Sequence, residues 1–205
     1  MINRFLKELS LYRNGAKVVV GVDEAGRGPL AGPVVAAAVW FEQEVDAPWW
    51  QQIRDSKKLN EARRGELAQI ISTHAQVGIG LADVAEIELN NILQASLQAM
   101  KRAIENLQVS LQDSHVLVDG KFLIPDLLAH EQRAVVKGDS LIHSIAAASI
   151  VAKVTRDNLM KEYSEKFPQY GFAQHKGYGT AAHIQAIKQY GLSPIHRVSF
   201  CGNFV

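Results

Sequence analysis

The chain has 205 residues, of which 47% are hydrophobic and 21% charged, and its formal net charge is +1. This composition is typical of a globular protein with a full core, and it excludes disordered and collagen-like chains. No apolar run reaches the roughly 18–20 residues of a membrane span, and residues 1–15 lack a signal-peptide core, so we expect a cytoplasmic protein with no membrane partner. Cys201 is the only cysteine, which excludes an internal disulfide and a thiolate zinc cluster.

The first half of the chain predicts three strands and two helices, after a short amphipathic helix pattern within residues 1–15. Residues 16–26 and 32–41 are apolar, β-branched runs separated by a glycine- and proline-rich stretch, which predicts two adjacent strands. A helix is expected after Asn60, which suits the N-cap, because apolar residues then recur at helical spacing. Residues 76–83 alternate as a third strand, and residues 85–107 carry an apolar helical stripe.

The second half predicts two further strands and a helical end. Residues 114–120 form the fourth strand and residues 132–139 a short fifth one. A long alanine-rich helix follows over residues 140–163, and a helical tail is expected from Thr180 onward. Because no repeat or linker is visible, we expect one α/β domain over residues 1–205. The first three strands lack long crossovers, which predicts antiparallel pairing there and parallel pairing later.

Four acidic residues lie where predicted strands end or helices begin. Asp23 and Glu24 follow the first strand, Asp119 ends the fourth, and Asp139 precedes the alanine-rich helix. Neighbouring strands would bring Asp23 and Asp119 together, and such a cluster would repel itself unless cations were bound. Mg²⁺ and Mn²⁺ prefer oxygen ligands and keep waters that a phosphate can displace. Each acid alone fits a turn, an N-cap (Asp139) or a solvated position, but their shared placement favours a metal site.

Six segments resemble bacterial ribonuclease HII, and together they span nearly the whole chain. They are DEAGRGPLAGPVVAAAV at 23–39, DSKKL at 55–59, VDG at 118–120, KGDS at 137–140, AAASIVAKVTRD at 146–157 and YGFAQHKGYGT at 170–180. Motifs this long and in this order are specific, unlike a lone glycine pattern. The resemblance implies a ribonuclease H-like α/β fold, with a central mixed five-stranded sheet flanked by helices and a helical C-terminal extension over residues 160–205.

The resemblance also implies an activity and its cofactors. The expected enzyme is an endonuclease that hydrolyses the phosphodiester 5′ to a ribonucleotide, in RNA–DNA hybrids or in DNA duplexes with embedded ribonucleotides, during DNA replication and repair. It would leave 3′-hydroxyl and 5′-phosphate ends and use two divalent ions, Mg²⁺ or Mn²⁺. By motif match, Asp23, Glu24, Asp119 and Asp139 are the catalytic, metal-binding carboxylates, with Asp23 bridging the two ions.

The resemblance assigns two segments to the substrate. Gly26, Arg27 and Gly28 match the segment that senses the ribonucleotide, and Tyr178 matches the tyrosine that packs on the following deoxyribose. Glycine allows close backbone approach to a 2′-hydroxyl, although a hairpin turn would also require it. Arg27 fits a phosphate clamp and a solvated turn residue equally well. The glycines around Tyr178 favour an exposed ring on a loop.

Other basic residues and histidines have less specific signals. Three lysines are candidate phosphate contacts, with a solvated surface as the alternative: Lys57, Lys58 and Lys176. Lys153 and Arg156 are one helical turn apart and face either the site or solvent. His175 and His183 are too far apart in sequence for a single-turn metal pair, which predicts packing, capping or surface roles.

Two rival functions compete with this interpretation. One is a ribonuclease H-fold nuclease that acts on branched DNA, although the ribose-sensing segments count against it. The other is a non-catalytic module that binds hybrids and whose acids are structural. The tail SFCGNFV departs from the family's usual ending and does not resemble a sliding-clamp-binding peptide. We expect a monomer whose partners are RNA–DNA hybrids and ribonucleotide-containing duplex DNA.

Overall fold

A computed structural model describes residues 5–42, 47–53, 59–127 and 131–204. Five strands form one sheet in the order β3-β2-β1-β4-β5. Their bounds are β1 Val18–Ala25, β2 Val34–Trp40, β3 Gln76–Ala82, β4 Ser114–Asp119 and β5 Glu131–Val135. β1, β2 and β3 pair antiparallel, whereas β4 pairs parallel to both β1 and β5. The five predicted strands and their mixed pairing are therefore confirmed.

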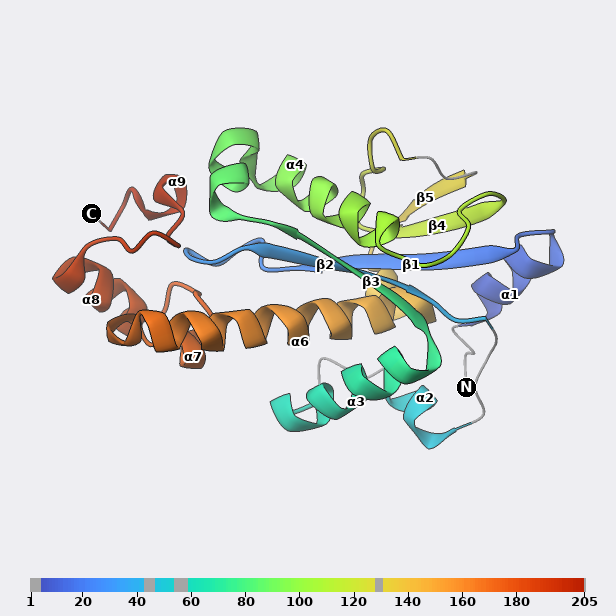
Figure 1. The fold of residues 1–205 in the computed structure, drawn as a ribbon, viewed down its shortest axis with the longest axis horizontal. Helices are drawn as coiled ribbons and strands as arrows, with labels where there is room; N and C mark the ends of the chain where they lie inside the picture. The colour runs from blue at the N-terminus through green and yellow to red at the C-terminus, as the bar shows by residue number, and fades with distance from the viewer. Residues whose placement is uncertain (1–4, 43–46, 54–58, 128–130, 205) are drawn as a thin grey trace.

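Helices cover both faces of this sheet (Figure 1). The helical segments are α1 Leu6–Arg13, α2 Pro48–Gln52, α3 Glu61–His74, α4 Val84–Glu105, α5 Gly138–Leu141, α6 His143–Lys166, η2 Pro168–Tyr170, α7 Phe172–His175, α8 Ala181–Tyr190 and α9 Val198–Cys201. α4 lies on one face and α6, backed by α3, on the other, while α7, α8 and α9 gather at the far end of α6. Among the described helices none is long and apolar enough to cross a membrane.

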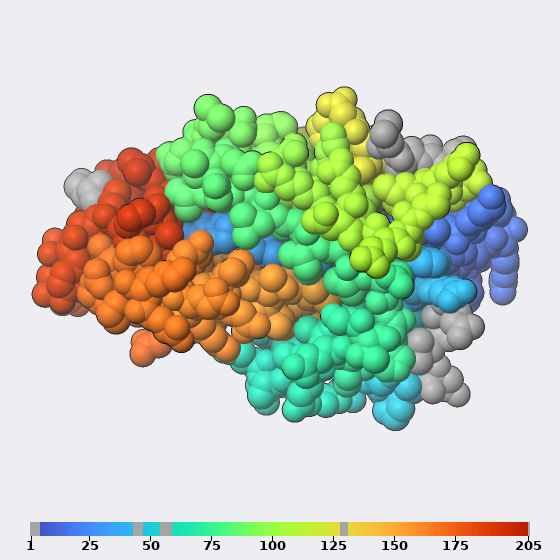
Figure 2. Space-filling model, in the orientation of Figure 1, coloured from blue at the N-terminus to red at the C-terminus, as the bar shows by residue number. Residues whose placement is uncertain are grey.

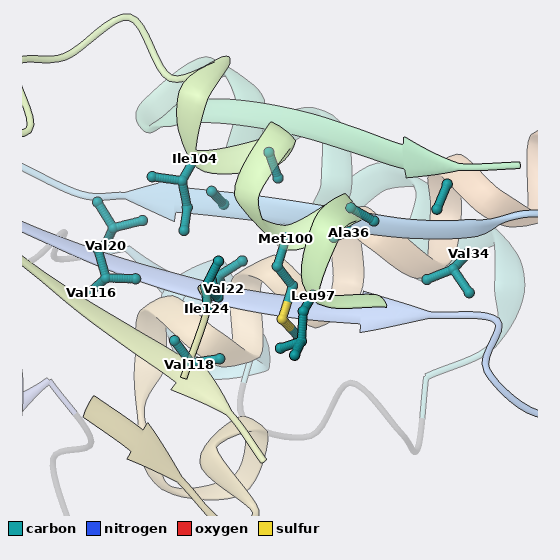
Figure 3. Packing of buried hydrophobic residues seen from close by; sticks show 14 of the residues in the cluster. Val20, Val22, Val34, Ala36, Leu97, Met100, Ile104, Val116, Val118 and Ile124 are labelled. Atoms are coloured by element: carbon teal, nitrogen blue, oxygen red, sulfur yellow. The ribbon is translucent and has the colours of Figure 1, made fainter. Parts of the chain in front are cut away.

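Alternation along β1 and β4 decides which side chains face each helix layer. Figure 3 shows Val20 and Val22 of β1 beside α4, in a core cluster with the following residues. These are Leu97, Met100 and Ile104 of α4 and Val116 and Val118 of β4. Each valine buried there contributes roughly 1.5–3 kcal/mol. The odd-numbered side chains of both strands, Asp23 and Asp119 included, therefore face α6.

The start of the alanine-rich helix differs from the prediction. Asp139 lies inside the short helix α5, whose N-cap is Lys137 in a left-handed conformation (φ 58°). The chain then becomes extended at Ile142, and α6 begins at His143. The N-cap role considered for Asp139 is therefore wrong. At this break Ile142 is buried in a cluster with Val19 and Leu117.

A carboxylate from α1 caps α6 instead. Glu8 is fully buried, and its Oε1 accepts hydrogen bonds from Ser144 N (3.0 Å) and Ser144 Oγ (2.9 Å). No side chain of the α6 N-cap residue, Ile142, makes such a bond. A negative group is favourable at a helix N-terminus because the first amide groups lack partners there. Burial nevertheless raises the pKa of Glu8 above its ordinary value, and its Oε2 has no hydrogen-bond partner among the described residues.

This arrangement predicts opposite effects for two substitutions. Glu8→Ala leaves both Ser144 donors unsatisfied and should reduce the free energy of unfolding by about 1–3 kcal/mol. Glu8→Gln keeps an acceptor oxygen and removes the buried charge, so it should equal or exceed the wild type at neutral pH. Because the pKa of Glu8 is raised in the folded state, the free energy of unfolding of the wild type, compared with that of Glu8→Gln, is highest below the ordinary pKa of 4.5. It declines as the pH rises through the raised pKa. Urea unfolding of the wild type and both variants across this pH range measures these free energies. A difference between wild type and Glu8→Gln that does not change with pH would contradict the prediction.

Candidate active site

Asp23 is held between the central strand and α6. It lies on the α6 face of β1 and is only 6% exposed. Its Oδ1 accepts a 2.7 Å hydrogen bond from Glu24 N, and Ser149 of α6 donates to its carboxylate. Val22 pairs with Val118 in the parallel β1–β4 register, so the next residues along the two strands, Asp23 and Asp119, are brought together as the sequence predicted.

Negative charge in this region is poorly compensated. Burial raises the pKa of Asp23 well above its ordinary value, and the charges of Glu24 and Asp119 raise it further. Burial likewise raises the pKa of Glu24, with Arg27 opposing the shift and Asp119 adding to it. Three carboxylates from two strands therefore share one electrostatic environment. A bound cation is the group that would stabilise all three.

Asp139 reaches the same region through its backbone. Its amide N donates to Asp119 Oδ1 at 3.3 Å, which places the start of α5 beside the end of β4. This contact follows from the short connection between β5 and α5. The structure thus gathers all four predicted acids at one end of the paired strands β1 and β4.

The chemistry of these donors fits a hard divalent cation. All are carboxylates, and the pKa of Asp23 is raised first by burial and further by the charges of Glu24 and Asp119. Within the described residues no three acidic, histidine or cysteine side chains are already arranged as a coordination site. Mg²⁺ commonly uses one or two carboxylates and completes its shell with waters and substrate phosphates. A set of nearby carboxylates that is not fully closed is compatible with that preference.

A pocket of about 360 Å³ opens beside the acids. It is lined by Glu24, Ala25, Gly26, Arg64, Ser149, Ile150, Lys153 and Tyr178. A larger groove of about 940 Å³ runs between α3 and α6, whose atoms lie next to each other along the lower side of Figure 2. None of the four clustered acids lines that groove. We therefore assign the chemistry to the smaller pocket despite its size.

The two predicted recognition segments meet at this pocket. A Cβ atom placed on Gly28 would lie 3.8 Å from Tyr178 Cε1, and the Tyr178 residue is 46% exposed. Arg27 forms an ion pair with Glu24 (3.2 Å). In the free protein Arg27 is therefore neither a bare phosphate clamp nor an unpartnered turn residue.

Of the three predicted lysines, only Lys176 is among the described residues. Lys57 and Lys58 lie outside the described residues. Lys176 is buried, its ammonium donates to Ala173 O, and it lies 3.6 Å from Glu61. This placement favours a structural role for Lys176 over the predicted phosphate contact.

Two residues at the site, Ser149 and Arg64, were not predicted with a role there, and a third, Lys153, was left open between the site and solvent. Ser149 contacts Asp23, while Arg64 of α3 and Lys153 of α6 line the pocket. Ser149 and Lys153 are four residues apart, so they lie on one face of α6. That spacing, together with the motif around them, was the available signal. Arg64 gave none, because its place depends on how α3 packs against α6.

The histidines of the C-terminal region pack together. The rings of His175 and His183 stack at 4.3 Å, and His183 Nε2 lies 3.0 Å from His196 Nε2. Burial lowers the pKa of all three, that of His196 to about 4. These contacts agree with the predicted packing role, although the sequence separation concealed the stacking.

Comparison with known proteins links this site to a family. The sequence model described as ribonuclease HII matches residues 20–203. A ribonuclease HII from Acetivibrio thermocellus is 50% identical over 209 residues, which cover 100% of this chain and 79% of that protein. A ribonuclease HII from Geobacter metallireducens is 53% identical over 191 residues, which cover 93% and 86% respectively.

A solved structure extends the comparison to the fold. The ribonuclease H2 of Pyrococcus horikoshii OT3 superposes with a TM-score of 0.73 at 27% identity, covering 89% of this chain and 93% of that one. The likeness confirms the predicted ribonuclease H-like fold, including its helical C-terminal region. The matched segment contains every acid of the site described above.

Proposed function

We propose that this chain, which belongs to the ribonuclease HII family and is a ribonuclease H enzyme, hydrolyses the phosphodiester 5′ to a ribonucleotide. Its substrates would be RNA–DNA hybrids and DNA duplexes with embedded ribonucleotides, and its products 3′-hydroxyl and 5′-phosphate ends. The observation that carries the proposal is the convergence of Asp23, Glu24 and Asp119 at the ends of the paired strands β1 and β4, beside a pocket that Glu24 and Tyr178 both line.

Ribonuclease H enzymes generally depend on divalent metal ions. Two such ions, when bound, would supply a nucleophilic hydroxide and stabilise the leaving oxygen in an in-line displacement. By the family resemblance, Asp23 would be shared between the ions, Asp119 and Asp139 would hold one ion each, and Glu24 would contribute at the edge. Ser149 orients the Asp23 carboxylate through its hydrogen bond. Either Mg²⁺ or Mn²⁺ fits these oxygen donors.

Substrate recognition would use the same pocket, which Gly26 and Tyr178 line. The segment Gly26–Gly28 lets the backbone approach a ribose 2′-hydroxyl closely, and the Tyr178 ring would pack on the adjacent deoxyribose. Lys153 and Arg64 supply positive charge for the phosphates. Lys153 is paired with Asp157 at 2.6 Å in the free protein, so it would have to exchange that partner for a phosphate.

One assay tests the function against both rivals. The protein is incubated with Mg²⁺ or Mn²⁺ and either a DNA duplex that contains one ribonucleotide or the same duplex without it. The proposal expects cleavage only of the first, 5′ to the ribonucleotide, and none after chelation. Retention of the ribonucleotide duplex without cleavage would identify a binding module. Cleavage of branched all-DNA junctions would identify the alternative nuclease.

Tyr178 variants test how the RNA–DNA junction is read. Tyr178→Ala should reduce kcat/KM on a junction substrate by about tenfold, because stacking on a ring contributes roughly 1–3 kcal/mol. Its effect on a uniform RNA–DNA hybrid should be smaller. Tyr178→Phe should be mild on both, since the ring face makes the contact. Equal slowing of both substrates by Tyr178→Ala, or slowing of neither, would contradict this role.

A further inference from the structure

Two arginines are buried beneath the recognition segments without an acidic partner. Arg156 of α6 is 1% exposed and Arg197, just before α9, is 0% exposed. No ion pair found in the described part of the chain involves either one. Burial lowers the pKa of both guanidinium groups. A buried charge is costly unless it is hydrogen-bonded, so the partners of these two groups need an explanation.

Arg197 is bonded to the carbonyl groups of the glycine-rich loop. Its Nη2 donates to Gly26 O (2.6 Å) and Gly32 O (2.7 Å), and its Nη1 donates to Arg27 O (3.0 Å). Nε also donates to Gly32 O at 3.0 Å, and the guanidinium lies 5.2 Å from the ring centroid of Phe200. One planar, rigid fork thus joins both ends of the loop over residues 26–32.

Arg156 joins the same loop to the segment that carries the tyrosine. Nε donates to Pro33 O (3.0 Å), Nη2 to Ala31 O (3.1 Å) and Nη1 to Lys176 O (3.0 Å). The Arg156 side chain also occupies the space beside Gly26 that a larger residue would fill. A Cβ added to Gly26 would lie 2.1 Å from Arg156 Nε. The loop and the residue two positions before Tyr178 are therefore tied to one side chain.

We propose that Arg197 and Arg156 are positioning residues for ribose recognition. They satisfy the loop's carbonyl groups from below and fix the distance between the Gly26–Gly28 segment and Tyr178, which together form one wall of the pocket. Neither arginine would touch the substrate. The proposal rests on the proposed function, because it assumes that this wall reads the ribose. It predicts that lysine, which keeps the charge but cannot span several carbonyl groups, is an inadequate replacement.

A purely structural role would affect stability without affecting ribose discrimination. The measured quantity is therefore a ratio: the Kd of a DNA duplex divided by the Kd of the same duplex with one ribonucleotide, both by fluorescence anisotropy in Ca²⁺ to avoid turnover. Arg197→Lys and Arg156→Lys are compared with wild type. Arg102→Lys is the matched control, because Arg102 also donates to a backbone carbonyl, Leu81 O at 2.6 Å, but lies on α4. Thermal melting is recorded for all four proteins.

We expect Arg197→Lys to reduce the ratio by about tenfold or more, since small misplacements at such sites have large effects. Its affinity for the all-DNA duplex should stay within about twofold of wild type, because backbone phosphate contacts supply that affinity. Arg156→Lys should act in the same direction, and Arg102→Lys should lower the melting temperature while keeping the ratio. The proposal would be overturned if Arg197→Lys and Arg156→Lys fold and keep the wild-type ratio of Kd values. It would also be overturned if they weaken binding of both duplexes by the same factor, so that only stability changes, as in Arg102→Lys.

Hydrogen exchange separates failure of this proposal from failure of the proposed function. The amides of Leu30 and Gly32, which donate to Gly177 O and Ile195 O, should exchange faster in Arg197→Lys than in wild type or Arg102→Lys. Unchanged exchange would remove the positioning role whatever the substrate. Faster exchange combined with a wild-type protein that neither prefers nor cleaves the ribonucleotide duplex would instead reject the proposed function, and with it the role in ribose recognition.

Discussion

Asp23→Asn is expected to reduce cleavage of a ribonucleotide-containing duplex by about 10³-fold or more, because it removes a carboxylate that we propose holds the divalent ions and so stabilises charge in the transition state. Substrate affinity should change little, since phosphate contacts lie elsewhere. The measurement is single-turnover cleavage in Mg²⁺ with the Kd determined separately. Asp83→Asn is a matched control, because Asp83 caps α4 and its neutralisation should leave the rate unchanged. Near wild-type cleavage by Asp23→Asn would remove Asp23 from the mechanism.

The same substitution should stabilise the metal-free protein. Burial and the charges of Glu24 and Asp119 raise the pKa of Asp23, which means that the folded state disfavours its charged form. Asparagine removes one of the repelling charges while its amide oxygen can still accept from Glu24 N. The melting temperature in chelator should therefore rise while activity disappears. A lower melting temperature would indicate that the carboxylates stabilise the free fold.

Gly26→Ala is expected to destabilise the protein by about 2–5 kcal/mol, whereas Gly28→Ala should leave its stability within about 0.5 kcal/mol of wild type. Gly26 has a φ of +99°, and an added Cβ would collide with Arg156 and with Pro33 O at 2.8 Å. Gly28 has no such conformation, and its added methyl meets Tyr178 at ordinary contact distance.

The two glycines thus separate folding from recognition. Gly28→Ala should still lower kcat/KM on a single-ribonucleotide duplex, because the methyl group would occupy the surface that the sugar approaches. Chemical denaturation and cleavage kinetics on both variants provide the comparison. Full activity in Gly28→Ala would show that the backbone at this position does not contact the ribose. A stable Gly26→Ala would show that Arg156 can move aside.

Much of the fold was predictable because its signals are local. The apolar runs that became β1, β2 and β4 are short and bounded by polar or glycine residues, so strand positions followed directly. The meeting of Asp23 and Asp119 followed from one further step, the adjacency of their strands. Asp139 was placed near the site but at the wrong point of its helix, since the burial of Ile142 is a tertiary effect.

The remainder of the site depends on contacts between distant segments. Arg197 bonds to Gly26, 171 positions earlier, and no periodicity or spacing in the sequence indicates such a contact. Ser149 and Arg64 reach the pocket only because α6 and α3 pack on the same face of the sheet. The sequence showed basic residues in these regions but could not separate a buried guanidinium from a solvated one.

The α1–α6 contact also orders events during synthesis. Glu8 and Ser144 are separated by 136 positions, and a ribosome adding about 5–20 residues per second needs roughly 7–27 s to cover that interval. During this time the Glu8 carboxylate has no helix end to cap and stays hydrated, so α1 can be held only by contacts with earlier segments, such as the hydrogen bond from Tyr12 Oη to Phe41 O. α1 therefore reaches its final position against α6 only after α6 has left the ribosome, although α1 lies far earlier in the chain.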